Sequence, residues 1–226
     1  MESEVKKKAQ ELYPNLLFGE SFNDGHVGGC NVNGDAATHY PVMWKYLVEL
    51  FEIKSVIDVG CGFGYSLDYF KKYLKLDAIG VEGSSKVKSL ALNQSSIYNH
   101  DYCTGPLTFE KEYDLCWSSE FVEHVEEKFI ENFMTTFCCC RYAAITYAGI
   151  GQGGYHHVNT NTNEYWVKTF ANYGLAYDEE VTLQLRKKTE EDRQKPTSPV
   201  DQSIIENWNW PYHFSERGLF FKNTHI

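Results

Sequence analysis

The chain has 226 residues, of which 42% are hydrophobic and 23% are charged, and its formal net charge is −10. This length suits one α/β domain with a sizeable core, and the composition excludes an intrinsically disordered chain. The negative charge, without any dense basic stripe, argues against a duplex nucleic-acid partner, which would need many phosphate contacts.

Apolar periodicity and turn residues predict the elements in chain order. A glycine- and asparagine-rich loop (25–35) and a helix (37–51) come first, followed by strands alternating with helices. The strands are expected near 55–59, 76–82, 96–99, 113–117, 143–147 and 175, with long helices over 120–137 and up to 173. We therefore expect an α/β fold with a mostly parallel sheet. The single domain, residues 1–226, divides into a cap (1–54), a core (55–180), a variable excursion (187–215) and a last strand (218–223).

No segment has the features of a targeting sequence or a membrane anchor. Residues 1–8 lack the apolar stretch of a signal peptide, and no apolar run approaches transmembrane length. The seven cysteines, three of them consecutive at 138–140, form no regular disulfide framework. We therefore expect reduced thiols, a cytoplasmic location and no membrane partner, whereas the oligomeric state cannot be read from the sequence.

The most informative segment is the strand and turn over residues 55–66. Its apolar strand ends in a turn that contains Gly60, Gly62 and Gly64, and glycine lets a backbone approach a ligand that any Cβ would block. One strand–helix unit later, the next strand ends at Glu82. In a doubly wound sheet an acid at this point reaches the hydroxyls of a bound ribose. The sequence thus predicts a nucleoside-containing cofactor, although an ordinary strand–turn–helix with glycines at the bend would look similar.

The spacing of the glycines distinguishes between nucleoside cofactors. A dinucleotide fingerprint would need a third glycine where this chain has Tyr65. Instead, Asp58-x-Gly60-x-Gly62-x-Gly64 with Glu82 downstream resembles motif I and its acidic partner in the class I S-adenosylmethionine (SAM) methyltransferases. The resemblance spans most of residues 55–180. It implies SAM as the cofactor and a seven-stranded, doubly wound sheet whose last strand is antiparallel.

Two further loops are expected to reach the same edge of the sheet. Asp101 could accept a hydrogen bond from the adenine amino group and Tyr102 could stack on the ring, although a plain polar turn is the alternative. Ser118 ends the fourth strand. The predicted cofactor-binding residues are therefore Asp58, Gly60, Gly62, Gly64, Glu82, Asp101, Tyr102 and Ser118.

A helix that began near residue 120 would place Glu120, Glu123 and His124 on one face, at i, i+3 and i+4. The loop after the next strand offers His156 and His157. Two carboxylates and two imidazoles suit Mg²⁺ or Mn²⁺, and the imidazoles favour a transition metal.

This E-x-x-E-H pattern resembles the metal-dependent O-methyltransferases of ubiquinone biosynthesis and of the small-RNA 3′-terminal ribose. The resemblance implies that the metal ligands are Glu120, Glu123, His124 and His157, with His156 interchangeable. Without a metal, Glu123 would cap the helix and His124 would bond to a loop, while His156 or His157 would serve as a catalytic general base.

These observations predict a SAM-dependent O-methyltransferase acting on a hydroxyl, of a vicinal diol above all, in a sugar, glycan or other small molecule. The alternatives are methylation of an RNA 3′-terminal ribose or of a protein, and a SAM-binding module without activity. Residues 20–40, 150–165 and 190–215, with Trp208 and Trp210, are expected to shape the acceptor pocket.

Overall fold

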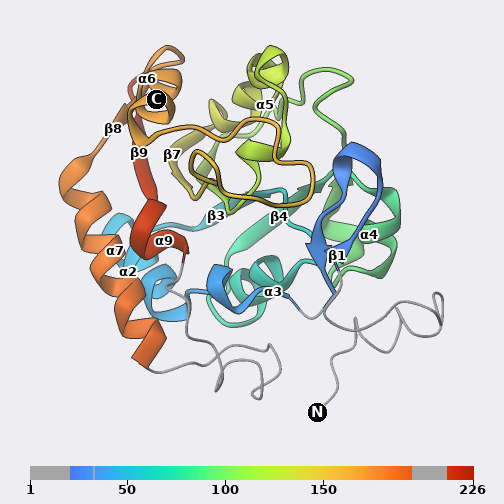
Figure 1. Ribbon diagram of the computed structural model, residues 1–226. Helices are drawn as coiled ribbons and strands as arrows, with labels where there is room; N and C mark the ends of the chain where they lie inside the picture. The colour runs from blue at the N-terminus through green and yellow to red at the C-terminus, as the bar shows by residue number, and fades with distance from the viewer. Residues whose placement is uncertain (1–20, 33, 195–212) are drawn as a thin grey trace.

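The computed structural model describes residues 21–32, 34–194 and 213–226. Within these ranges a seven-stranded sheet has the order β5-β4-β3-β6-β7-β9-β8 (Figure 1). In chain order its strands are β3 (Ser55–Val59), β4 (Asp77–Glu82), β5 (Ile97–Asn99), β6 (Tyr113–Ser118), β7 (Cys140–Ile145), β8 (Leu175–Tyr177) and β9 (Leu219–Asn223).

Strands β5, β4, β3, β6 and β7 pair in parallel, as the alternation of strands and helices predicts. Strand β9 pairs antiparallel with both β7 and β8 and lies between them. The predicted doubly wound, mostly parallel sheet with an antiparallel last strand is therefore confirmed. Parallel neighbours end at the same edge of the sheet, so the loops after β3, β4 and β6 meet there.

Helices cover both faces of the sheet (Figure 1). The longer ones are α2 (Pro41–Phe51), α3 (Tyr65–Lys72), α4 (Ser85–Leu90), α5 (Ile130–Phe137), α6 (Asn163–Ala171) and α7 (Glu179–Gln194), and a short α9 (His213–Arg217) leads into β9. Successive strand residues serve opposite faces. Val56 packs with Trp44 of α2 and Phe70 of α3, whereas Ile57 belongs to the core formed by α5 and α6.

The segment that precedes α2 forms a small cover on the sheet. Strands β1 (Ser21–Phe22) and β2 (Cys30–Asn31) pair antiparallel around the 3-10 turn η1 (Gly25–Val27), and the turn η2 (Ala36–Thr38) follows. Phe22 and Val32 pack against Phe63 and against Val87 and Leu90 of α4. Below, residues 21–32 are called the strap.

Two predicted elements differ from those observed. Residues 120–137 are not one helix: two 3-10 turns, η4 (Val122–His124) and η5 (Glu127–Phe129), precede α5. The carbonyl of Glu123 accepts from the amides of Val158 and Asn159 instead of from a helical amide. The expected excursion at 187–215 begins inside α7, which continues to Gln194, and most of its remainder, with Trp208 and Trp210, lies outside the described residues.

A short 3-10 turn, η3 (Gln94–Ser96), completes the connections on the β5 side. No helix in the described part of the chain combines the length and the apolar character that crossing a bilayer requires.

Candidate active site

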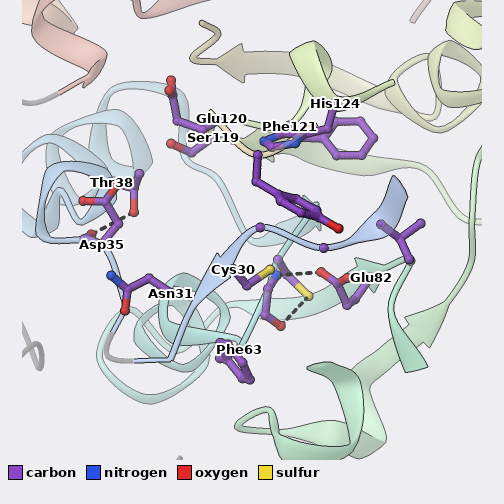
Figure 2. A pocket seen from close by; sticks show the side chains of 18 of the residues that line it. Cys30, Asn31, Asp35, Thr38, Phe63, Glu82, Ser119, Glu120, Phe121 and His124 are labelled. Carbon is purple, nitrogen blue, oxygen red and sulfur yellow. Dashed lines mark hydrogen bonds between the residues drawn. The ribbon is translucent and has the colours of Figure 1, made fainter. Parts of the chain in front are cut away.

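A cavity of about 420 Å³ lies at the edge of the sheet where β3, β4 and β6 end. Its lining comes from the strap, the turn after β3, the end of β4, the loop at 100–103, the loop after β6, residues 152–157 and His213 (Figure 2). This is the position at which ligands bind in open α/β sheets.

The turn after β3 depends on glycine at two positions in particular. Gly60 has φ of 71°, and a Cβ there would lie 2.7 Å from Cδ2 of Phe121. Gly64, with φ of 76°, begins α3, and its Cβ would lie 2.8 Å from the carbonyl oxygen of Leu92. Both conformations are ones that other residues adopt only at a cost. The turn therefore keeps bare backbone beside the cavity.

Glu82 lies at the end of β4 with only 4% of its surface exposed. One carboxylate oxygen accepts from the amide of Gly62 at 2.9 Å and the other from that of Ser84 at 2.8 Å. A carboxylate has about four acceptor positions, so each oxygen retains one for a ribose hydroxyl. Burial raises the pKa of Glu82 to about 7.

Asp58, in β3, also lines the cavity and accepts a hydrogen bond from Ser66. Burial raises the pKa of this carboxyl to about 7 as well, although the bond from Ser66 opposes the shift. Two carboxyls poised near neutrality, next to a glycine turn, match the positions predicted for cofactor binding.

The remaining predicted cofactor residues differ in their orientation. Asp101 lines the cavity and accepts from Nε2 of His26 and from the amide of Cys103, both at 2.8 Å. Tyr102 also contributes to the lining, but its ring packs in the core and its hydroxyl bonds to Thr136 at 2.8 Å. Stacking on adenine would need that ring to leave the core. The Ser118 hydroxyl donates to the carbonyl of Val59, so it faces the sheet rather than the cavity.

Three of the predicted metal-binding residues come together. The ligand atoms of Glu123, His124 and His157 lie within 4.8 Å of one another. Glu123 is fully buried, and its oxygens lie near backbone amides without a well-formed hydrogen bond. Burial raises its pKa well above the usual value. Burial also lowers the pKa of His124 to about 4, with contributions from the two other histidines, so this imidazole is neutral at pH 7.

Glu120 and His156 do not join this group. Because the chain breaks into 3-10 turns, the predicted i, i+3, i+4 face does not form, and Glu120, with φ of 50°, lies on the Ser119 side of the loop, apart from His124 (Figure 2). His156 is absent from the described lining, and its Nδ1 lies 3.1 Å from the His124 carbonyl. Of the two histidines, the structure thus brings only His157 to the cavity.

Glu120 instead faces α9. One of its carboxylate oxygens lies 3.9 Å from Nη2 of Arg217 and 4.0 Å from Nε2 of His213. Nη2 of Arg217 lies 2.8 Å from Nδ1 of His213, and because arginine only donates, Nδ1 accepts and the ring proton is on Nε2. That nitrogen is 3.4 Å from Asp35. Burial lowers the pKa of His213, but the two carboxylates more than offset this effect.

The strap is bonded to the start of α4 and to the loop after β7. Asp24 accepts from Ser84 at 2.7 Å and pairs with Lys86 at 2.6 Å, while the Tyr155 hydroxyl donates to the carbonyl of Gly25 at 2.7 Å. These bonds hold the strap over the cavity.

Several lining residues were not predicted individually. They are His26, Asp35, His39 and His213, from regions expected only to shape the pocket. No periodicity or spacing identifies them, because their role depends on contacts with residues far along the chain. The glycines and asparagines of the 25–35 loop were the available signal, and they indicate a loop without assigning a role to any of these residues.

Comparisons with known proteins give one family model for part of the chain and a shared fold. Residues 57–137, from β3 to the end of α5, match the family model described as a methyltransferase domain. No curated protein matched the chain.

Solved structures share the fold at low sequence identity. The plantazolicin methyltransferase BpumL, solved with a substrate analogue and S-adenosylhomocysteine, is 15% identical; the alignment covers 81% of this chain and 83% of that one, with a TM-score of 0.55. An O-methyltransferase from a polyketide synthase multienzyme of Brevibacillus brevis, with S-adenosylhomocysteine, is 17% identical over 82% and 73% of the two chains, with a TM-score of 0.50. At such identities the likeness concerns the fold alone.

The glycine turn, Glu82 and the matched family model lie in the same half of the sheet. Residues 57–137 therefore match a methyltransferase domain, and these findings together indicate a SAM-dependent methyltransferase with the fold that the solved structures share.

Proposed function

We propose that the protein transfers the methyl group of SAM to a hydroxyl of a vicinal diol, in a sugar, glycan or other small molecule, with the help of a divalent metal. The observation that carries this proposal is the cluster of Glu123, His124 and His157 beside the cofactor cavity.

The cluster fits a cation in three respects. Burying the Glu123 carboxylate without a partner is costly, and a cation would offset that cost. Nδ1 of His124 is buried without a hydrogen bond, and the ring is neutral, as a ligand must be. Nδ1 of His157 lies 3.0 Å from the Gln152 carbonyl, so it carries the proton and leaves the Nε2 lone pair available. One carboxylate and two imidazoles suit Mn²⁺ better than Mg²⁺.

The residues of the chain position both reactants. Glu82 holds the ribose and the glycine turn lets the cofactor lie against the backbone, which sets the sulfonium methyl at the edge of the sheet. The acceptor oxygen attacks this methyl in line, forming the C–O bond as the C–S bond breaks, and S-adenosylhomocysteine leaves. When bound, the metal would lower the pKa of the acceptor hydroxyl and hold two neighbouring oxygens. His157 is placed to receive the hydroxyl proton if no metal takes part.

The experiment measures S-adenosylhomocysteine release with catechol and methyl glycosides as acceptors, against phenol as a matched single hydroxyl. We expect turnover with diols only, stimulation by Mn²⁺ and loss with a chelator. Glu123→Gln and His157→Ala should each reduce kcat/KM by at least about a hundredfold. His156→Asn, which tolerates the same left-handed backbone, is the control and should keep its activity.

The outcomes separate the competing mechanisms. Full activity in both cluster variants would refute the metal mechanism. Loss in His157→Ala together with resistance to the chelator would favour a histidine base instead. Turnover confined to RNA 3′ ends or to a protein would replace the small-molecule acceptor.

A further inference from the structure

One part of the cavity lining belongs neither to the cofactor site nor to the Glu123 cluster. It comprises Asp35, Thr38, Ser119, Glu120 and His213, all of which line the cavity. They come from the segment before α2, the loop after β6 and α9, so only the folded chain brings them together. We call this group the Glu120 subsite.

Within this subsite, no residue in the described part of the chain donates a hydrogen bond to the Glu120 carboxylate. Its Oε1 is buried without a partner, and Oε2 approaches Arg217 and His213 only to 3.9 and 4.0 Å. The backbone at Glu120 is fixed, since its amide donates to Thr146 at 2.9 Å and φ is 50°. A carboxylate that is only 17% exposed, with Arg217 and His213 beyond hydrogen-bond distance, is costly, and a ligand that donates to it would offset the cost.

The charge around the subsite is negative. The charge of Arg217 offsets one of the two carboxylate charges, those of Asp35 and Glu120. Its other N–H groups donate to the Tyr147 carbonyl and to Glu216. His213 carries no charge in the tautomer whose Nδ1 accepts from Arg217, although Asp35 and Glu120 raise its pKa above the usual value. Among the described lining residues there is no lysine or arginine, whereas five are acidic: Asp35, Asp58, Glu82, Asp101 and Glu120.

His39 supplies a second polar atom without a partner. It lines the same cavity, its exposed fraction is 4%, and its Nε2 has no hydrogen-bond partner among residues 21–32, 34–194 and 213–226. Burial lowers the pKa of His39 to about 3, so the ring is neutral at physiological pH and adds no positive charge. The described lining thus offers carboxylates and a neutral imidazole, but no lysine or arginine to pair with a phosphate.

We propose that Glu120 anchors the acceptor by pairing with a protonated amine, so that the acceptor is an amino-substituted polyol and not a phosphorylated one. The identity of the molecule as an acceptor rests on the proposed function; the pairing of Glu120 with an amine does not. Glu120 thereby has a role other than the metal-binding one that its sequence motif predicts.

The test measures binding to the complex with S-adenosylhomocysteine by NMR titration of the ¹⁵N-labelled protein. The probes share a diol and differ in charge: 3-amino-1,2-propanediol, glycerol and glycerol 3-phosphate. We expect the amine to bind about tenfold more tightly than glycerol, a difference of about 1.4 kcal/mol in binding free energy. The phosphate should bind more weakly than either. Glu120→Gln, which keeps the shape of the side chain, should remove the advantage of the amine.

Two further variants complete the design. Asp35→Asn keeps an acceptor for the Ala37 amide and removes a second charge, so it should also weaken amine binding, even if Glu120→Gln fails to fold. Glu131→Gln makes the same change of charge at an exposed position on α5. It should leave the order of the three probe affinities unchanged.

The proposal is overturned if glycerol 3-phosphate binds as tightly as the amine, if no probe binds, or if both Glu120→Gln and Asp35→Asn retain the preference for the amine. Failure of the proposed function looks different. In that case the three probes still bind with the expected order of affinities, but no methyl ether forms when SAM replaces S-adenosylhomocysteine.

Discussion

At the scale of single residues, burial determines the chemistry of the cofactor site. Glu82 and Asp58 are almost inaccessible to solvent, and burial raises the pKa of each carboxyl to about 7. Ribose hydroxyls and a sulfonium both favour the ionised form of Glu82. Cofactor binding should therefore release protons in the range where these carboxyls titrate.

We expect the affinity for SAM to fall as the pH falls below 7. With a pKa of about 7 in the free protein, roughly one tenth of Glu82 is ionised at pH 6, so the Kd should be about tenfold higher at pH 6 than at pH 8. Calorimetric titrations of the protein and of Glu82→Gln test this, because the titration of SAM itself is common to both. Equal pH dependence in the two proteins would contradict the assignment.

At the scale of elements, a side chain of one helix caps the N-terminus of another helix that is distant in sequence. The carboxylate of Asp192, near the end of α7, accepts from the amides of Val42 at 2.7 Å and Met43 at 3.0 Å, in the first turn of α2. These amides have no partner within their own helix. Tyr40, which precedes α2, provides no side-chain cap. The start of α2 therefore depends on α7, which packs in the same core on one face of the sheet.

Asp192→Ala should reduce the free energy of unfolding by about 1–2 kcal/mol, the usual cost of losing an N-terminal cap. Asp192→Asn retains one acceptor and should lose less. Urea denaturation measures both, and Glu191→Ala, an adjacent acid that contacts Lys188 at the surface, is the control. If Asp192→Ala is as stable as Glu191→Ala, the cap does not contribute.

At the scale of the whole molecule, segments from both ends of the chain converge on the cavity. The strap comes from the N-terminal part, Tyr155 from the loop after β7, and His213 from α9, which precedes the last strand. Since α9 leads directly into β9, which pairs with β7 and β8, the position of His213 depends on that pairing.

The strap should control how fast the cofactor leaves. Tyr155→Phe removes the bond to the Gly25 carbonyl, worth about 1 kcal/mol, and should raise the dissociation rate of SAM roughly fivefold. Stopped-flow displacement measures this rate. Tyr165→Phe loses a comparable bond to Glu127 outside the described lining and should leave it unchanged. The same rate in both variants would show that the strap does not retain the cofactor.

Much of the fold could be predicted from the sequence. The alternation of strands and helices, the glycine turn and Glu82 all appear in the structure at or near the expected positions. The helix over 120–137 could not be predicted correctly. Phe121 and Phe129 have helical spacing and pack in the same core as α5, but the Glu123 carbonyl bonds to the loop at 158–159. The spacing of apolar residues predicts which side chains are buried. It does not predict which amide donates a hydrogen bond to a given backbone carbonyl.

The sequence by itself determined the glycine turn after β3 and the acid at the end of β4, because a strand period, glycines at left-handed positions and an acid at a strand end are local properties. Tertiary structure alone decided how the other loops meet at the cavity. It separated Glu120 from Glu123 and His124, brought His157 rather than His156 to the cavity, and placed His213 and Arg217 beside Glu120. The physical reason is that the direction of a side chain in a loop depends on backbone angles fixed by contacts with distant parts of the chain.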